Sequence, residues 1–549
     1  MIIKNITTHK KLFSGNTLVL FIILFFSFIV LWPVLIREGW PLNHEGLGWR
    51  SRIICYVYHF KQGDIFPIWS SPETFRMGTP LPLYYHKLFS YLGAIVYLFI
   101  NDMKSTFIAC LTIVNFVGVF GLYKALMRID VRKEVALVVS LSLLFQYYTI
   151  TDWFIRGAFA EYTAMMLIPW FFYWAFGLLV HRKYSYSIGL IFGFTYLAHS
   201  IIAYYLIFAI VFAQLLYLYI NKPKIRVVLV LYLKAACVAI PMIVLFNFPI
   251  LITSKYYDPS YIKLDMTNHF LEIIWYFYNP AYTWNKTWEG YTVELNPVMV
   301  VFIVMMCLAT IFLAKQKSTS RKPIFIYISF LFLFYALLQL RSSHIFYETI
   351  PGADFIQFPW RLLSFIQICA LLLLAMLFNS CYDVRSLKRA GLVYLIVIAF
   401  FYPLFKPTAE SWQWFEAEYV NRKVNEAVYG IGEYNPIVKG YNKPSVEYFD
   451  SISARGIETM SRFSTVKPYA NNTMPEQLEL RYKINTLQSD TVILPLSFSG
   501  LELAYKTKDN ERIVLRSYRL DSDPRIRIAL PKGNYDLLVY LPSMRNFFK

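Results

Sequence analysis

Long apolar segments recur along the first 405 residues of this 549-residue chain. The segments Thr17–Ile36, Val298–Leu313 and Leu362–Leu377 are long enough, or nearly so, to cross the core of a bilayer, which takes about 20 residues of helix. Counting such segments predicts about eleven transmembrane helices. No small-residue cleavage site follows the first segment, so we interpret it as a retained helix and not as a signal peptide. The pattern therefore predicts an α-helical polytopic membrane protein.

Two parts of this pattern leave little room for ordinary crossings. Residues 88–126 could hold two helices, but the charge pattern described below allows one, so we expect residues 88–101 to lie along the outer face or to dip into it. Residues 187–220 must cross twice within a short length. This predicts a turn near His199 and Ser200, at or below the outer surface.

The periodicity changes near the C-terminus. From about residue 475, short runs alternate between apolar and polar positions, as in Leu478–Tyr482, Arg525–Ile528 and Tyr535–Tyr540. Gly, Pro, Asn and Asp residues separate these runs. Such alternation with turn residues between the runs is typical of antiparallel strands, and it predicts a small β-sandwich.

These patterns divide the chain into two predicted domains. Residues 1–405 form a transmembrane domain with a large first outer loop at residues 37–87, and residues 406–549 form a C-terminal domain. We expect a surface helix at residues 412–430, before the sandwich. The composition agrees, because 57% of the residues are hydrophobic and 16% are charged, whereas soluble domains have about 25% charged residues. An ordinary soluble enzyme is thereby excluded.

The formal net charge of +19 is concentrated in six short connections between the apolar segments. These connections hold 18 Lys and Arg residues against two acids, at residues 1–16, 128–133, 181–186, 221–226, 315–322 and 382–389. The connections that alternate with them hold 12 Lys and Arg residues against 13 acids, at residues 37–87, 151–161, 251–296 and 341–361. This asymmetry is the positive-inside pattern and not a nucleic-acid-binding patch. We therefore expect a cytoplasmic N-terminus, with the second set of connections and the C-terminal domain outside.

The six cysteines fall singly, mostly in or beside apolar segments, without CxxC spacing. This arrangement indicates neither a disulfide framework nor a structural zinc site. No ligand set in the sequence requires a metal, although an acidic site could recruit a divalent ion.

Polar residues at the outer ends of the apolar segments are the first candidates for chemistry. His44 and Glu45 follow the first helix, and a carboxylate beside a histidine at low dielectric can act as a general base. A solvated loop acid is the simpler alternative. Arg156 and Glu161 lie at the outer start of a helix, where they could equally form an interfacial ion pair.

Three further candidates follow along the chain. His199 interrupts an apolar hairpin, and although ionisable groups at membrane depth are often functional, a lone histidine is more often structural. Arg361 lies at the outer mouth of the next helix, where its fork suits a phosphate or serves as a snorkelling anchor. Glu433 and Tyr434 open the outer domain. All these residues fall on the same predicted side of the membrane, so one cavity could collect them.

Taken in order, the motifs resemble a large family of bacterial membrane proteins described as 6-pyruvoyl-tetrahydropterin-synthase-related. The matching residues are His44-Glu45, Arg52, Gly63, Trp69, Gly78-Thr79-Pro80, Tyr84-Tyr85, Arg156-Gly157-Ala158, Ala160-Glu161, His199, Gln357-Phe358-Pro359-Trp360-Arg361, Glu433-Tyr434 and Pro436. The chain departs from the family where Glu45 replaces an Asp, Trp49 a second His, and His86-Lys87 a pair of prolines. The missing histidine counts against two-histidine chemistry or a metal site there.

The resemblance implies the architecture of the GT-C glycosyltransferases, which take a sugar from a polyprenyl-phosphate carrier and use an acid in the first outer loop. It implies transfer at the outer face of a bacterial inner membrane to a cell-surface glycan or lipid-linked acceptor, as in O-antigen modification of lipopolysaccharide. The C-terminal domain would then be periplasmic. A polyprenyl-phosphate sugar synthase and a flippase would be functional partners, and the lipid-linked sugar donor would be the main small molecule.

The same resemblance assigns roles to residues. Glu45 would be the general base, with Glu161 as its rival, and His44 would orient the reacting groups. Further substrate-binding candidates are Arg52, Arg156, His199, Arg361, Trp69, Tyr84, Tyr85, Glu433 and Tyr434.

Two other function classes remain open from the sequence. A transporter or flippase of lipid-linked sugars would share the apolar groove and the arginines, but the predicted helices carry few charges at the membrane midplane. A membrane-anchored glycan-binding protein would need only the outer domain, which leaves the acid and the arginines near the membrane unexplained.

Overall fold

A computed structural model describes residues 15–41, 43, 45–71, 77–181, 185–257, 269–270, 322–379, 414–415, 461–468, 478–508 and 511–543. The chain divides into two compact units. One comprises Met1–Gly46, Lys104–Ile240 and Asp265–Val420 and is called the helical unit below. The other comprises Leu47–Met103, Pro241–Leu264 and Asn421–Lys549 and is called the mixed unit. The domain boundary predicted at residue 405 lies outside the described residues.

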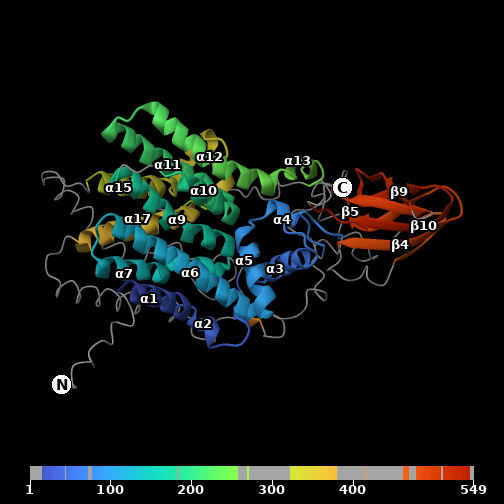
Figure 1. The fold of residues 1–549 in the computed structure, drawn as a ribbon, viewed down its shortest axis with the longest axis horizontal. Helices are drawn as coiled ribbons and strands as arrows, with labels where there is room; N and C mark the ends of the chain where they lie inside the picture. The colour runs from blue at the N-terminus through green and yellow to red at the C-terminus, as the bar shows by residue number, and fades with distance from the viewer. Residues whose placement is uncertain are drawn as a thin grey trace, which may run out of the picture. The chain divides into compact units, whose positions relative to one another are not determined.

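The helical unit is built from apolar helices that lie side by side (Figure 1). Helix α9 is its centre: nearly all of its side chains are buried, and it contacts α10, α11 and α17. The main helices are α1 (Gly15–Ile29), α6 (Met103–Arg128), α7 (Lys133–Ser142), α9 (Phe159–Leu179), α10 (Ser187–Ala198), α11 (Ser200–Asn221), α12 (Ile225–Asn247), α15 (Lys322–Leu338) and α17 (Leu363–Asn379). Short elements link them, namely α2 (Trp32–Leu35), η1 (Leu143–Phe145), α8 (Tyr147–Ile150), the π-helix η2 (Thr151–Arg156), η6 (Arg341–Ser343), α16 (His344–Thr349), η7 (Ala353–Ile356) and η8 (Pro359–Leu362).

Among the described residues, five helices are long and apolar enough to cross a membrane, or six if the bent pair Lys133–Phe145 and Tyr148–Arg156 forms one span. Several apolar helices of such length describe a multi-pass membrane protein, as the sequence predicts. The predicted total of about eleven stays a prediction, because segments such as Val298–Leu313 lie outside the described residues.

The structure describes both segments, residues 187–220 and 88–101, in which the hydrophobic pattern leaves little length for crossings. Helix α10 ends at Ala198 and α11 begins at Ser200, and His199 between them has an extended backbone, so the predicted turn is confirmed. Helix α5 (Leu88–Ile100) has 13 residues and stops at Asn101, which adopts the left-handed conformation common at helix ends. At 1.5 Å per residue it spans about 20 Å, too short to cross the roughly 30 Å hydrocarbon core unaided.

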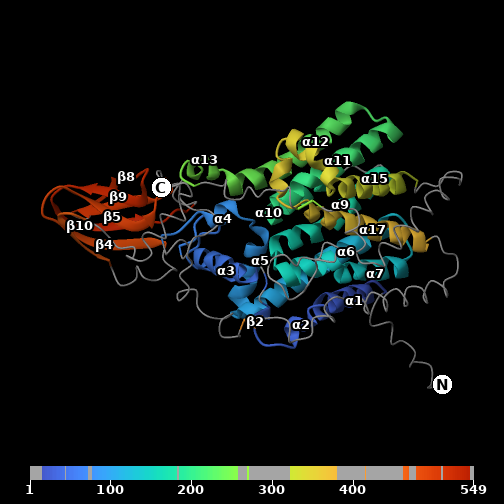
Figure 2. The ribbon, with the colours of Figure 1, turned by 180° about the vertical axis from the view of Figure 1, so that it is seen from behind.

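The mixed unit contains two antiparallel sheets that share one hydrophobic core (Figure 2). The larger sheet has the order β3-β4-β10-β6-β7 and the smaller one β5-β9-β8. The strands are β3 (Ser464–Pro468), β4 (Glu479–Thr486), β5 (Asp490–Ser497), β6 (Leu503–Lys508), β7 (Glu511–Leu515), β8 (Ser517–Leu520), β9 (Asp523–Leu530) and β10 (Gly533–Tyr540). Alternate residues of the two sheets face each other, which confirms the predicted antiparallel sandwich. The first strand begins earlier than predicted, at Ser464.

Segments from elsewhere in the chain complete this core. Trp69 from the first loop and Tyr257, which follows α13 (Ile250–Thr253), are buried among the strand side chains. The hydroxyl of Tyr257 donates to the carbonyl of Phe498 at 3.3 Å. Helices α3 (Gly46–Lys61) and α4 (Leu81–Tyr84) also belong largely to this unit. The core of the sheets therefore includes side chains from residues 47–103 and 241–264 as well as from the strands.

The prediction of a surface helix at residues 412–430 is wrong at the two residues of that range that the structure describes. Trp414 and Phe415, within the predicted surface helix 412–430, form strand β2, which pairs with Trp40 and Pro41 of β1. The buried ring of Trp40 packs on Phe107 at 4.9 Å between centroids. An extended segment can add backbone hydrogen bonds to this anchored strand, which a helix at the same place could not do.

The mixed unit also buries a network of polar side chains. Nδ1 of His59 lies 2.9 Å from Oδ2 of Asp64, and the Ser543 hydroxyl donates to the same oxygen at 2.7 Å. The Phe66 amide donates to Oδ1 of Asp64 at 3.2 Å, and Nε2 of His59 donates to the carbonyl of Trp69 at 2.8 Å. Burial alone would lower the pKa of His59, but the bond to Asp64 raises it to about 10. The pairing with His59 also outweighs the burial of Asp64 and lowers its pKa.

Candidate active site

A cluster of four charged side chains is buried in the helical unit. Nη1 of Arg156 lies 2.5 Å from Oδ1 of Asp152 and 3.0 Å from Oε2 of Glu161. Nε of Arg361 lies 3.1 Å from the same Glu161 oxygen. The hydroxyl of Tyr148 donates to the other oxygen of Glu161. All four charged residues are less than 10% exposed, so one carboxylate is shared by two arginines out of contact with water.

The local backbone explains how Arg156 reaches this position. It is the last residue of η2, a π-helix, and such wide turns occur frequently at functional sites. Gly157 ends the turn with a φ of +66°, a conformation that favours glycine. A Cβ there would come within 2.7 Å of the Asn43 side chain. Any other residue at this position would push away the loop that follows β1.

That loop places Glu45 beside the cluster. The Asn43 side chain donates to the carbonyl of Phe154 at 3.3 Å, and the Glu45 amide donates to the carbonyl of Arg156 at 2.8 Å. Glu45 is half-buried, and its carboxylate is near enough to interact electrostatically with Asp152 and Arg156. The loop that carries Glu45, the general base predicted from the sequence, is therefore held against the π-helix by two hydrogen bonds.

Aromatic rings flank the two arginines. The guanidinium of Arg156 lies 4.6 Å from the ring centre of Trp360, and that of Arg361 lies 5.0 Å from Phe358. The rings of Phe358 and Trp360 stack at 4.9 Å. Nη1 of Arg361 donates to the carbonyl of Ile356 at 2.9 Å and to the Gln357 side chain at 2.8 Å. These contacts fix the orientation of both guanidinium groups before any ligand arrives.

The backbone at Gln357 is strained. Its φ is +63°, which non-glycine residues seldom adopt, and this costs about 1–3 kcal/mol. The strained residue accepts a hydrogen bond from Arg361 and immediately precedes the stacked ring of Phe358. Strain of this kind is retained where the surrounding structure demands it, and here it sets the direction of Arg361.

His199 reaches the same cluster from the break between α10 and α11. It is 4% exposed, and its Nδ1 accepts a hydrogen bond from the Ile202 amide at 3.3 Å. In the neutral ring the proton therefore sits on Nε2. Arg156 and Arg361 are both close enough to interact with it electrostatically. The structure thus brings His199 together with the acid and both arginines.

The remaining predicted site residues lie in the other unit or outside the described residues. Arg52, Trp69, Tyr84 and Tyr85 belong to the mixed unit, and His44, Glu433 and Tyr434 lie outside the described residues.

Within the mixed unit these aromatic side chains have contacts of their own. Trp69 is 1% exposed in the sandwich core, so both ring faces contact protein. The Tyr84 hydroxyl lies 2.9 Å from that of Thr253, and the Arg52 guanidinium lies 3.7 Å from the ring centre of Tyr85.

Two residues of the cluster were not singled out from the sequence. Asp152 precedes Arg156 by four residues, so the helical spacing of this opposite-charge pair was available as a signal. Its Oδ2 is buried and has no hydrogen-bond partner among the described residues. Tyr148 had no such signal, because nothing local distinguishes it from the many other tyrosines. The described residues contain no group of three or more His, Cys, Asp or Glu side chains that could hold a metal ion.

No protein-family model matches the chain, and no curated protein matches it significantly. Similar solved structures include the arabinofuranosyltransferase AftD from Mycobacteria, with 15% identity and a TM-score of 0.42 over 71% of this chain and 27% of that one. A mutant form of AftD gives 14% identity and a TM-score of 0.43, over 71% and 28% of the two chains. The Archaeoglobus fulgidus oligosaccharyltransferase in the apo form gives 12% identity and a TM-score of 0.37, over 80% and 57%. The chain thus covers less than two thirds of each of these proteins.

The fold and the cluster together define a class. The chain is a multi-pass membrane protein with a buried, preorganised ionic site in its helical unit and an antiparallel sandwich near its C-terminus. The resemblance to the pterin-synthase-related family remains a prediction from the sequence motifs.

Proposed function

We propose that the chain is a membrane glycosyltransferase of the GT-C type, which transfers a sugar from a polyprenyl-phosphate carrier to a cell-surface glycan or a lipid-linked acceptor. The observation that carries this proposal is the docking of Glu45 against Arg156, in a cluster that also holds Arg361 and His199. A half-buried acid next to fixed cations is what sugar transfer from a phosphate requires.

In the proposed reaction a hydroxyl oxygen of the acceptor attacks the anomeric carbon of the donor sugar. The bond from that carbon to the phosphate oxygen breaks, and the phosphate leaves with the electron pair. Glu45 takes the proton of the attacking hydroxyl. Of the acids in the cluster, Glu45 is the best placed to do so, because Glu161 is already bonded to both arginines and to Tyr148.

Arg361 is the proposed contact for the departing phosphate. Its Nε faces Glu161 and its Nη1 donates twice to the protein, but its Nη2 has no hydrogen-bond partner among the described residues. A guanidinium held at two nitrogens can offer the third to a phosphate oxygen without reorganising. Arg156 bonds Asp152 and Glu161 and contributes its charge at longer range. Asp152 and His199 are assigned as positioning residues.

The proposed location is the outer face of a bacterial inner membrane, with the N-terminus cytoplasmic and the C-terminal domain periplasmic. The alternation of basic and neutral connections supports this orientation. Leu487, which is 71% exposed on the sandwich, offers a test after native cysteines are replaced. A Leu487→Cys variant should react with an impermeant maleimide in intact spheroplasts, and reaction only after permeabilisation would reverse the orientation.

Purified protein in sealed liposomes, supplied with radiolabelled polyprenyl-phosphate glucose and bacterial surface oligosaccharides, separates the function classes. Label transferred to the oligosaccharide supports the enzyme. Label that crosses the bilayer on its carrier without transfer means a transporter, and label that is retained without either outcome means a binding protein. The assay is repeated with a panel of other polyprenyl-phosphate sugars. If every donor gives crossing without transfer, or retention alone, the proposal is overturned.

A further inference from the structure

An open groove with a volume of about 850 Å³ lies at one end of the sandwich in the mixed unit. At this end the chain passes from one sheet to the other twice, between β4 and β5 and between β9 and β10. The residues Ser461 and Arg462, just before β3, form one side of the groove. Three separate segments therefore build the groove on a rigid scaffold of strands.

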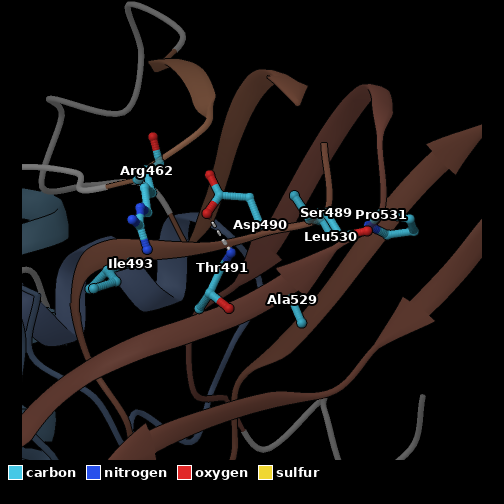
Figure 3. A pocket seen from close by; sticks show the side chains of 9 residues that line it. Arg462, Ser489, Asp490, Thr491, Ile493, Ala529, Leu530 and Pro531 are labelled. Carbon is cyan, nitrogen blue, oxygen red and sulfur yellow. Dashed lines mark hydrogen bonds between the residues drawn. The ribbon is translucent and has the colours of Figure 1, made fainter. Parts of the chain in front are cut away.

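A saturated carboxylate holds the wall of the groove together. Oδ2 of Asp490 accepts hydrogen bonds from the Phe463 amide at 2.8 Å and from the Ser464 hydroxyl at 2.6 Å. Oδ1 of Asp490 accepts from the Thr491 amide at 2.8 Å, as Figure 3 shows. The carboxylate of Asp490 thus links the start of β3 to the start of β5, and both of its oxygens accept hydrogen bonds from the protein itself. The side chain of Arg462 is the cation that remains at the rim.

The floor of the groove combines a hydroxyl with a small apolar side chain, and an aromatic residue outside the lining lies next to the hydroxyl. Thr491 of β5 pairs with Ala529 of β9. The Ala529 side chain is exposed and is only a methyl group, so the groove is deeper there than at its larger neighbours. The Thr491 hydroxyl lies 3.5 Å from the hydroxyl of Tyr518 on β8, whose side chain is 37% exposed. Pro531 continues the apolar floor in the turn after β9. Hydroxyls, an arginine and apolar surface thus alternate over a short distance.

A sugar ring presents the complementary surface. Its edge carries hydroxyls that both donate and accept hydrogen bonds, and its faces carry C–H groups that pack on aromatic and aliphatic side chains. The groove lies within the range of about 300–1,000 Å³ typical of small-molecule sites. Among the lining residues Asp490 is the acid and Arg462 the base, so the groove carries one charge of each sign.

From these features we propose that the groove binds an oligosaccharide segment of the acceptor glycan, apart from the ionic cluster where the sugar is transferred. The proposal rests on the proposed transferase function for the identity of this glycan as acceptor. The binding itself does not depend on transfer. A glycan held in this way would be retained between successive encounters with the donor.

The test uses the full-length protein in lipid nanodiscs and an array of defined bacterial surface oligosaccharides of two to eight sugars. The tightest-binding member is then titrated by calorimetry. Thr491→Val removes one hydroxyl at nearly constant volume and should weaken binding roughly three- to tenfold, as expected for one hydrogen bond. Ala529→Leu fills the hollow and should weaken it at least tenfold. The control is Thr465→Val, the same change at an exposed position on the outer face of the larger sheet, and binding should not change.

Each outcome decides the proposal. Loss of binding in both groove variants, with the control unchanged, supports it. If no oligosaccharide binds, or if Thr465→Val is as damaging as Thr491→Val, the groove is not the site. Glu45→Gln should bind the glycan normally although its transfer is lost, which separates binding from transfer. In the wild-type protein, binding without transfer would refute the transferase, and transfer without groove-dependent binding would refute the groove.

Discussion

The cluster around Arg156 in the helical unit and the His59–Asp64–Ser543 network in the mixed unit are both buried, but they differ in how completely their polar atoms are paired. In the mixed unit, both nitrogens of His59 and both carboxylate oxygens of Asp64 have partners. In the helical unit, two arginines share Glu161, and Oδ2 of Asp152 has no hydrogen-bond partner among the described residues.

Under the proposed function, we expect this difference to separate a structural network from a functional one. A buried polar group without a partner costs about 1–3 kcal/mol, so a network that serves stability alone is expected to pair its polar atoms. The Arg156 cluster keeps unsatisfied atoms, a strained backbone at Gln357 and the half-buried acid Glu45. Such features lower stability, and a bound substrate can relieve part of this loss. Substitutions in the first network should change stability alone. Substitutions in the second should change transfer, with a loss of stability as well where a buried ion pair is broken.

The largest effect is expected at Glu45. Glu45→Gln keeps the shape of the side chain and removes the base, so transfer should fall by about 10²–10⁴-fold while donor binding and thermal stability stay unchanged. The measurement is single-turnover transfer of radiolabelled sugar. Glu38→Gln, an exposed acid in the same connection, is the matched control and should be fully active. Near wild-type transfer by Glu45→Gln would place the base elsewhere, with Asp152→Asn as the next variant to assay.

At Glu161 the two properties should change together. Removing its charge leaves two buried arginines without their shared partner, and breaking a buried ion pair from one side costs roughly 3–5 kcal/mol. Glu161→Gln should therefore lower the unfolding temperature in detergent strongly. Glu348→Gln is the control, since its pair with His344 is exposed and it should shift the temperature little. A stable Glu161→Gln protein without transfer, alongside an active Glu45→Gln, would make Glu161 the base.

A smaller effect is expected at Arg361. Arg361→Lys keeps the charge but loses the fork, and a charge-assisted contact is worth about 1.5–3 kcal/mol, so transfer should fall roughly ten- to hundredfold. The loss should appear in turnover at saturating donor. Arg341→Lys, at an exposed position in the same outer connection, should behave like the wild type. An active Arg361→Ala with unchanged donor affinity would remove Arg361 from the phosphate site.

The His59–Asp64 network should respond to pH and not to substrate. Because the pKa of His59 is raised from 6.5 to about 10, its stabilising contribution is complete below pH 6.5 and is lost as the pH rises towards 10. The loss is at most about 1.4 kcal/mol per pH unit. Asp64 has a lowered pKa, so its contribution is lost only in acid.

Hydrogen exchange of residues 59–69 in the full-length protein, corrected for intrinsic rates, measures this loss. Protection should decline between pH 7 and pH 10 in the wild type and stay flat in Asp64→Asn, where His59 has lost its partner. Ser543→Ala keeps the pair and should retain the pH dependence at lower overall protection. A wild-type protein whose protection is constant to pH 10 would show that the pair does not stabilise this segment.

Features that depend on neighbouring residues were predictable from the sequence. The break at His199 follows from fitting two apolar helices into a short segment, and the strands at Leu478–Tyr482 and Tyr535–Tyr540 follow from alternation. For the break and the strands, local pattern along the chain carried the information. The gathering of Glu45, Arg156 and Arg361 joins distant segments, and the sequence predicted only that it was possible, because each motif was placed on one side of the membrane.

Other features that join distant segments were not predictable. Ser543 reaches Asp64, and Trp69 enters the sandwich core, although hundreds of residues separate the partners. The alternation of apolar and polar residues along the strands does not predict which loop will cover their core. Trp69 was a substrate-binding candidate from the sequence because aromatic residues near a membrane surface can serve several purposes. Only packing distinguishes a buried core ring from an accessible one.

The pairing of β1 with β2 has a consequence for the order in which the protein is made. Trp40 and Pro41, just before the Glu45 loop, pair with Trp414 and Phe415. At about 5–20 residues per second, the ribosome reaches Phe415 roughly 20–75 s after Pro41. Throughout that interval β1 lacks its partner strand, so the backbone pairing next to the Glu45 loop forms only after most of the chain has been translated.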